Sequence, residues 1–211
     1  MIADIGCGPG TSAVTLLERG YQVVGVEPNA EMRAVAKTAL GRNHHFSIVD
    51  GTAESTGLAD HSVDLVLAAQ AFHWFNVPAA RQEFLRILRR PPWVALTWNT
   101  MRMDTPFMAE YESLLQQFGT DYRQVHHKLL GDDKFATMYP HGCRRQVFAN
   151  VQSFNFDGLA GRLRSSSFIP RENDPPFTPM MAELQRVFEQ HQCDGIVRLD
   201  YDAELFLGVA D

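Results

Sequence analysis

The strongest chemical signal in the chain is a glycine-rich segment, Asp4–Thr11 (Asp-Ile-Gly-Cys-Gly-Pro-Gly-Thr), between a short apolar run and an amphipathic stretch. Glycines at a strand-to-helix turn let a ligand approach the backbone, and the free amides of the following helix attract a negative group. In the dinucleotide fingerprint a frame that begins at Gly6 has its third glycine at position 11, which is Thr11 here. This spacing disfavours a nicotinamide or flavin dinucleotide.

Three further clusters follow apolar runs that are typical of strands. Glu27 comes after Tyr21–Val26, and an acidic side chain at this place in doubly wound folds accepts hydrogen bonds from ribose hydroxyls. Asp50–Glu54 follows the third run, and Ala69–Phe75 ends the fourth. Because open α/β sheets bind ligands at the carboxyl ends of their strands, the sequence predicts that these segments surround one site.

The elements that must position these clusters alternate between strand and helix. Apolar, β-branched runs predict strands, and apolar residues at helical spacing after a capping residue predict helices. Helices are expected at Thr11–Arg19 and after Asn29, Asn76 and Thr105, with strands at Ile2–Ile5, Tyr21–Val26, His45–Val49, Val63–Ala69 and Trp93–Trp98. Repeated strand–helix–strand units predict a parallel sheet with helices on both faces.

The alternation weakens after Gly119, and residues 121–145 carry no readable pattern. We expect a strand at Val151–Phe156, a loop at Arg162–Pro176, a last helix from Thr178, and one or two strands over Ile196–Val209.

The turn after the helix that begins at Asn76 is also unusual. Pro91 and Pro92 supply neither a positive φ nor an amide donor. The sequence therefore predicts a shortened hairpin there.

Composition limits the class of protein. The 211 residues carry a formal net charge of −6, which argues against a dedicated nucleic-acid binder. There is no apolar run of about 18–20 residues for a membrane span, and no basic-then-apolar leader. The three cysteines are too widely spaced for a disulfide framework or a zinc site, and the histidine pairs lack chelate spacing. We expect a cytoplasmic protein without a metal, a membrane or a nucleic acid as partner.

In motif order from Ile2 to about Asn99, the chain resembles the class I S-adenosylmethionine-dependent methyltransferases of the small-molecule, type 11-like group. The resemblance implies a Rossmann-like α/β fold: a doubly wound, mostly parallel seven-stranded sheet with helices on both faces and an antiparallel last strand. It implies a cofactor-binding core over residues 1–100 and a substrate-cap region over 101–170. Residues 171–211 would complete the same sheet, within a single domain.

The resemblance also implies roles for individual residues. The glycines would pack against the methionine end of S-adenosylmethionine, Glu27 would hold both ribose hydroxyls, and Ala53 and Glu54 would bracket the adenine. The expected cofactor-binding residues are Asp4, Gly6, Gly8, Gly10, Glu27, Pro28, Thr52, Ala53, Glu54 and Gln70. Thr52 stands where relatives usually carry Asp, so a contact to the adenine amino group is not implied.

The expected acceptor pocket is aromatic, which suits a cationic sulfonium. It comprises Phe72, His73, Trp74, Phe75, Trp98 and Arg102. His73 is the candidate for removing a proton, although a lone histidine beside aromatic residues is more often simply packed.

The implied reaction is in-line methyl transfer to a small-molecule acceptor, which leaves S-adenosylhomocysteine; proximity supplies much of the rate. The alternative is a module of the same fold that binds the cofactor with little or no turnover. A nicotinamide-linked oxidoreductase is the third reading. The sequence names neither the acceptor nor the atom methylated.

Relatives carry a helical segment before the first strand, and this sequence starts at Met1. We therefore expect an apolar patch beside Val14, Leu17 and the first strand, with weak closure over the cofactor. A homodimer that buries this patch is one expectation. The other is a longer natural chain that covers it.

Overall fold

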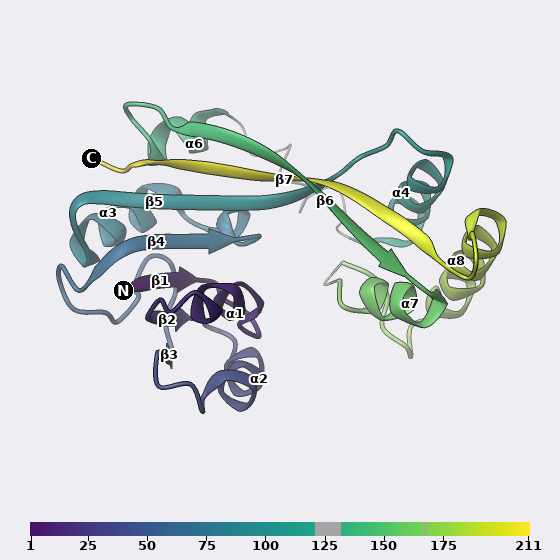
Figure 1. Ribbon diagram of the computed structural model, residues 1–211, viewed down its shortest axis with the longest axis horizontal. Coiled ribbons are helices and arrows are strands. Elements are labelled where there is room, and N and C mark those ends of the chain that lie inside the picture. Colours follow the sequence, from purple (N-terminus) through teal and green to yellow (C-terminus); the bar gives the residue numbers. More distant parts are fainter. Residues whose placement is uncertain (121–131, 167) are drawn as a thin grey trace. The chain divides into compact units, whose positions relative to one another are not determined.

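The computed structural model describes residues 1–120, 132–166 and 168–211 (Figure 1). The chain forms two compact units. The first comprises Met1–Trp98, Leu130–Gln146 and Glu204–Asp211, and the second comprises Asn99–Leu129 and Val147–Ala203. The sequence-based division into a cofactor-binding core, a substrate cap and a C-terminal part that completes the sheet stays a prediction. These regions are 1–100, 101–170 and 171–211.

The strands form one seven-stranded sheet in the order β3-β2-β1-β4-β5-β7-β6. Most strands are parallel and the last ones are antiparallel, which confirms the predicted fold class. In the first unit β1 pairs in parallel with β2 and β4, and Asp4 lies opposite Gly25. The strands are β1 (Ile2–Ile5), β2 (Val23–Val26), β3 (Phe46–Val49), β4 (Val63–Ala69), β5 (Leu88–Met101), β6 (Arg144–Phe154) and β7 (Val197–Val209).

The helices of the first unit are α1 (Thr11–Glu18), α2 (Ala30–Leu40), α3 (Val77–Ile87) and α6 (Asp132–Met138), with a short 3-10 helix, η1 (Phe72–Trp74). Those of the second unit are α4 (Pro106–Phe118), α7 (Phe156–Arg164) and α8 (Phe177–His191). No described helix has the length and apolar character that crossing a membrane requires.

Side-chain caps start three of these helices at the predicted places. Asn29 Oδ1 accepts hydrogen bonds from the amides of Glu31 and Met32, at 2.9 and 3.2 Å, and so begins α2. Asn76 and Thr105 cap α3 and α4 in the same way. Each cap satisfies amide groups that have no acceptor within the first turn of a helix.

Two expectations for the C-terminal half are wrong in their bounds. The strand expected at Val151–Phe156 is β6, which ends at Phe154, because Asn155 Oδ1 accepts the Gly158 amide at 2.9 Å and starts α7. The expected loop therefore begins only after Arg164.

The shortened hairpin is also wrong. Helix α3 passes directly into β5 at Leu88, and the two prolines lie in a bulge of that strand, since Val63 of β4 pairs with Leu88 and Leu65 pairs with Trp93. A bulge tolerates proline because its residues do not donate amides to the neighbouring strand.

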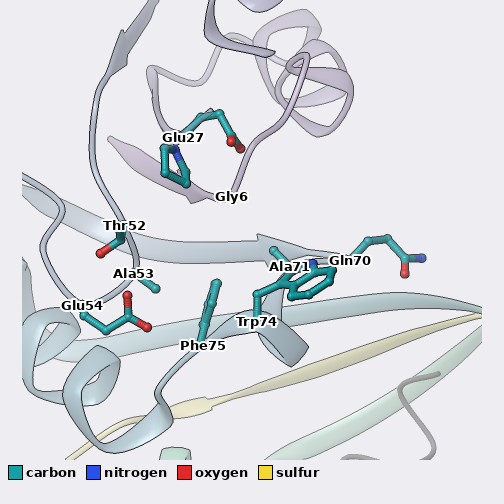
Figure 2. Close-up of a pocket in the computed structure, with 10 residues that line it drawn as sticks. Gly6, Glu27, Thr52, Ala53, Glu54, Gln70, Ala71, Trp74 and Phe75 are labelled. Atoms are coloured by element: carbon teal, nitrogen blue, oxygen red, sulfur yellow. The ribbon is translucent and has the colours of Figure 1, made fainter. Parts of the chain in front are cut away.

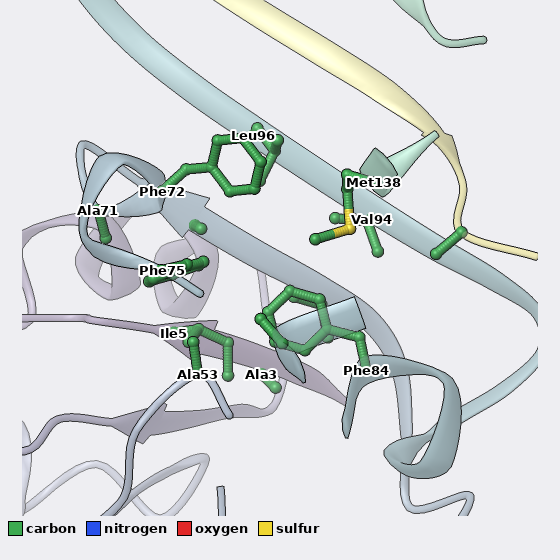
Figure 3. Packing of buried hydrophobic residues seen from close by; sticks show 14 of the residues in the cluster. Ala3, Ile5, Ala53, Ala71, Phe72, Phe75, Phe84, Val94, Leu96 and Met138 are labelled. Atoms are coloured by element: carbon green, nitrogen blue, oxygen red, sulfur yellow. The ribbon is translucent and has the colours of Figure 1, made fainter. Parts of the chain in front are cut away.

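The core of the first unit lies between the sheet and its helices. Figure 3 shows Ile5 from β1, Phe72 from η1, Phe84 from α3 and Leu96 from β5 packed together, with Met138 beside β5. The rings of Phe72 and Trp98 meet edge to face, with centroids 6.0 Å apart. This packing fixes the ends of the strands that carry the polar clusters.

The second unit has its own core, formed by α4, α7, α8 and one face of β7. Its fully buried members include Met108, Leu159, Leu163, Leu184 and Leu199. Each unit thus buries a separate apolar cluster.

The patch expected around α1 is smaller than predicted. Leu17 packs with Ala13, Val23 and Phe46 in a third cluster, while Val14 stays 39% exposed. Self-association through this face stays a prediction.

Candidate functional site

A cavity of about 330 Å³ opens in the first unit, where β1, β2, β3 and β4 end (Figure 2). Four segments that are far apart in the sequence meet there, as the sequence predicted from the strand ends. The cavity is lined by Gly6, Glu27, Pro28, Thr52, Ala53, Glu54, Gln70, Ala71, Trp74 and Phe75. Figure 2 shows Glu27 and Gly6 on one side of it, and Glu54 and Phe75 on the other.

The glycine-rich segment turns sharply between β1 and α1. Gly6, Gly8 and Gly10 have φ values of 68°, 54° and 88°, a region that side chains rarely adopt. A Cβ on Gly6 would lie 2.7 Å from the Ala71 Cβ, and one on Gly10 would lie 2.7 Å from Leu40 Cδ1. A Cβ on Gly8 would meet nothing within 4 Å, so open space lies against this part of the backbone.

Glu27 is fixed at the end of β2. Its Oε2 accepts the Gly8 amide and its Oε1 accepts the Asn29 amide, both at 2.9 Å. The residue is 8% exposed. A carboxylate has about four acceptor positions and the two amides use two, so each oxygen can still accept a hydroxyl. The arrangement suits a ligand with two adjacent hydroxyl groups.

Asp4 is fully buried under the glycine segment. Its Oδ2 accepts the Ser12 hydroxyl at 2.5 Å, while its Oδ1 has no hydrogen-bond partner among the residues that the structure describes. Burial, with the nearby charge of Glu27 as a smaller cause, raises the pKa of Asp4 to about 6. An unpartnered buried carboxylate oxygen is costly unless a donor or a cation completes it.

The loop after β3 folds into a small hairpin. The Thr52 amide donates to the Ser55 carbonyl at 3.0 Å, and the Ser55 amide donates back at 3.3 Å. Ala53 and Glu54 form the tip, and Glu54 Oε1 accepts the Asn76 amide at 2.8 Å. The tip is thereby tied to the start of α3.

The end of β4 adds a strained residue and two aromatic rings. Gln70 has a φ of 57°, which costs free energy for a residue with a Cβ, and such strain clusters at functional sites. Trp74 is 66% exposed at the edge of the cavity, whereas Phe75 is almost fully buried. Phe75 also borders a second cavity of about 290 Å³, beside Lys134 of α6.

Several predicted site residues lie elsewhere. Phe72 and Trp98 do not line this cavity, because both are buried in the core beneath it. Arg102 belongs to the second unit, where its guanidinium pairs with Asp104. Asp4, Gly8 and Gly10 shape the glycine segment without lining the cavity, and Ala71, which the sequence reasoning missed, does line it. Its place directly after Gln70, a predicted site residue, could have indicated that Ala71 lines the cavity.

His73 is half-buried beside the cavity rather than in its lining. Its ring centroid lies 4.7 Å from that of Trp74, and its Nδ1 has no partner among the described residues. Burial, and secondarily the charge of Lys134, lowers its pKa and so favours the neutral ring. Within the described part of the chain no cluster of His, Cys, Asp and Glu has an arrangement that could hold a metal ion.

Comparison with known proteins identifies similar sequences over this region. The methyltransferase domain family matches residues 3–95. An uncharacterized methyltransferase of Mycobacterium tuberculosis is 35% identical over 140 residues, which cover 66% of this chain and 55% of that protein. The chain thus matches only about half the length of that relative.

Solved structures share the fold. A protein of Anaeromyxobacter dehalogenans assigned as a type II methyltransferase superposes with a TM-score of 0.72 at 21% identity, over 99% of this chain and 89% of its own. The geranyl diphosphate C-methyltransferase of Streptomyces coelicolor, in complex with Mg²⁺, geranyl diphosphate and S-adenosyl-L-homocysteine, gives 0.51 at 11% identity. That match covers 100% of this chain and 73% of the other.

Proposed function

We propose that this chain is a class I S-adenosylmethionine-dependent methyltransferase, that its cavity binds S-adenosylmethionine and that the protein methylates a small molecule. The family match over residues 3–95 includes every residue that lines the cavity. S-adenosyl-L-homocysteine in the Streptomyces coelicolor structure supports the same ligand class.

The observation that carries the proposal is the carboxylate of Glu27, which lines the cavity next to the open space at Gly8. Glu27 would accept both ribose hydroxyls, and Asp4 Oδ1 has the charge to attract the ammonium of the methionine part. The backbone at Gly8 leaves room for the chain of atoms between them. These residues therefore fit the cofactor.

The charge of the cavity supports a cationic ligand. Among the described residues the lining holds two carboxylates, Glu27 and Glu54, and no Lys, Arg or His. The exposed face of Trp74 adds a surface that attracts cations. Such a cavity favours the sulfonium form of the cofactor over the uncharged thioether product, which helps the product to leave.

The bound cofactor would supply a methyl group already activated by the positive charge on sulfur. The protein must hold the acceptor in line with that methyl group and exclude water. Phe75 and the strained residue Gln70 line the cavity and would contact an acceptor that enters it. His73, kept neutral by burial, is the candidate to take a proton from an acceptor that carries one.

One observation favours the alternative, a module that binds the cofactor without turnover. In the described structure the lining holds no histidine, cysteine or lysine side chain, and His73 lies outside the lining. Such a module would keep the Glu27 and Asp4 contacts and lack an acceptor site.

The test has two stages. Calorimetry should show binding of S-adenosylhomocysteine and no binding of NAD; the reverse result refutes the family reading of the cavity. A single-turnover assay with methyl-labelled cofactor and a pool of small acids and phenols should then transfer label. Binding without any transfer, in the presence of an active reference methyltransferase as control, would favour the non-catalytic module.

A further inference from the structure

We propose that Glu83 of α3 is a positioning residue that holds the Thr52–Ser55 hairpin in the conformation that recognises the adenine base of the cofactor. This rests on the proposed function, since Glu27, the expected ribose acceptor, and the hairpin line the same cavity. An adenosine whose ribose lies at Glu27 presents its base to the hairpin tip.

The hairpin tip carries main-chain amides that can donate hydrogen bonds to a ligand. Its base is closed by the two bonds between Thr52 and Ser55. The main-chain amides of Ala53 and Glu54 donate to no atom among the described residues. Ring nitrogen N1 of adenine is an acceptor, whereas N1 of hypoxanthine carries a hydrogen. Free amides at this tip can therefore distinguish the two bases.

Two backbone bonds between Thr52 and Ser55 close the hairpin, and the chain beside it approaches itself closely at Gly51. A Cβ on Gly51 would lie 2.7 Å from the Thr56 carbonyl oxygen, so the chain doubles back closely at this point. Thr56, directly after the hairpin, is fully buried. The position of Thr56 therefore sets the position of the tip.

Glu83 fixes Thr56 through two bonds to one oxygen. Glu83 Oε1 accepts the Thr56 amide at 2.8 Å and the Thr56 hydroxyl at 2.6 Å. The hydroxyl oxygen accepts the Leu58 amide at 3.2 Å and so continues the chain of bonds. Residues 27 apart in the sequence are joined in this way.

Arg86 in turn holds Glu83. Its Nε donates to Glu83 Oε2 at 2.8 Å and its Nη2 donates to Oε1 at 2.7 Å, a two-point contact. Nη2 also donates to the Leu58 carbonyl at 2.8 Å. The Glu83 side chain is 10% exposed, and Arg86 as the main cause lowers its pKa to about 2. The carboxylate therefore stays charged over the working pH range.

The hydrogen bonds from Thr56 to Glu83 and from Asn76 to Glu54 both connect the hairpin region to α3. The helix therefore holds the hairpin at its tip and just beyond its base. Loss of one of these bonds should free the tip to tilt, which weakens discrimination between bases more than it weakens the fold.

The test compares S-adenosylhomocysteine with S-inosylhomocysteine, in which the amino group of the base is replaced by oxygen. Calorimetry on the whole chain is run for the wild type, Glu83→Gln, Thr56→Val and Asp60→Asn. Asp60 also pairs with Arg86, but it is 68% exposed and does not contact Thr56, so its variant is the matched control.

We expect the wild type to prefer the adenine ligand by about tenfold or more, the effect of one well-placed hydrogen bond. Glu83→Gln and Thr56→Val should lower this ratio at least threefold, and Asp60→Asn should leave it unchanged. Hydrogen exchange at the Thr56 amide should speed up in Glu83→Gln, while thermal unfolding monitored in parallel confirms that each variant is folded.

The outcomes separate the two claims. If the wild type does not bind S-adenosylhomocysteine, the proposed function fails, and the positioning role fails with it. If the wild type binds and prefers adenine, but the folded Glu83 and Thr56 variants keep the same ratio, the positioning role alone is overturned. If Asp60→Asn lowers the preference for adenine equally, the positioning role is also overturned, because the effect would then not depend on the contact between Glu83 and Thr56.

Discussion

Replacement of Glu27 by alanine should weaken cofactor binding strongly and destabilise the fold only slightly. In the structure its carboxylate accepts the Gly8 and Asn29 amides at 2.9 Å, and it keeps acceptor capacity for two hydroxyl groups. A hydrogen bond to a charged group contributes about 1.5 kcal/mol, so the loss of two ribose contacts should cost about 2–3 kcal/mol. This corresponds to an increase in the dissociation constant of about 30- to 150-fold.

The fold should suffer less. The two amides lose their acceptor but lie beside an open cavity, so water can reach them, and we expect a loss of about 1–2 kcal/mol in the free energy of unfolding. Glu27→Gln keeps one acceptor oxygen and loses the charge, so its effect on affinity should be intermediate.

The assay is calorimetric titration with S-adenosylhomocysteine at a temperature where circular dichroism shows each variant folded. Glu31→Ala is the matched control, because Glu31 is an exposed acidic residue in the first turn of α2 and does not line the cavity. A folded Glu27→Ala variant with the wild-type dissociation constant would refute the assignment of Glu27 to the ribose.

Three further outcomes follow from the same site. Because burial raises the pKa of Asp4 to about 6, above its ordinary 3.8, its ionisation costs stability as the pH rises from about 4 to 6. Asp4→Asn should therefore raise the free energy of unfolding at pH 7.5 by up to about 3 kcal/mol, with no gain at pH 3.5. The same variant should weaken cofactor binding. Urea unfolding at the two pH values checks the effect on stability, and a loss of stability at pH 7.5 contradicts it. Gly8→Ala should fold with a cost of about 1 kcal/mol from its positive φ and lose affinity for S-adenosylhomocysteine, since its Cβ points into open space; unchanged affinity would show that no ligand approaches there. His73→Asn should lower the single-turnover rate for an acceptor that loses a proton and leave the dissociation constant for S-adenosylhomocysteine unchanged; an unaltered rate would remove His73 from the mechanism.

The sequence predicted the cavity-bearing half of the fold well, because its signals are local. Asn29 and Asn76 cap helices through bonds to amides two or three residues away, and the glycine segment needs positive φ values wherever it occurs. The strand ends that carry Glu27 and Gln70 then converge, since parallel strands end at the same edge.

What the sequence missed depends on tertiary packing. Phe72 and Trp98 were expected in the acceptor pocket, but an aromatic residue at a strand end can face either the cavity or the core, and both lie in the core. The bonds from Glu83 to Thr56 join residues that no local pattern relates. Helix α7 was missed because the Ser- and Arg-rich stretch after it hid the apolar spacing of Leu159 and Leu163.

The first unit is assembled from three separate stretches of chain, and the last of them is Glu204–Asp211. Its members are structural: Ala210 is fully buried and its amide donates to the Pro92 carbonyl at 3.0 Å, and the Phe206 ring packs 5.8 Å from Trp98. During synthesis on a ribosome, every residue that lines the cavity leaves the exit tunnel long before these eight residues do. The cavity's support is therefore completed only after Glu204–Asp211 has been synthesised, and nascent chains must keep the β5 edge from pairing with other strands until β7 arrives.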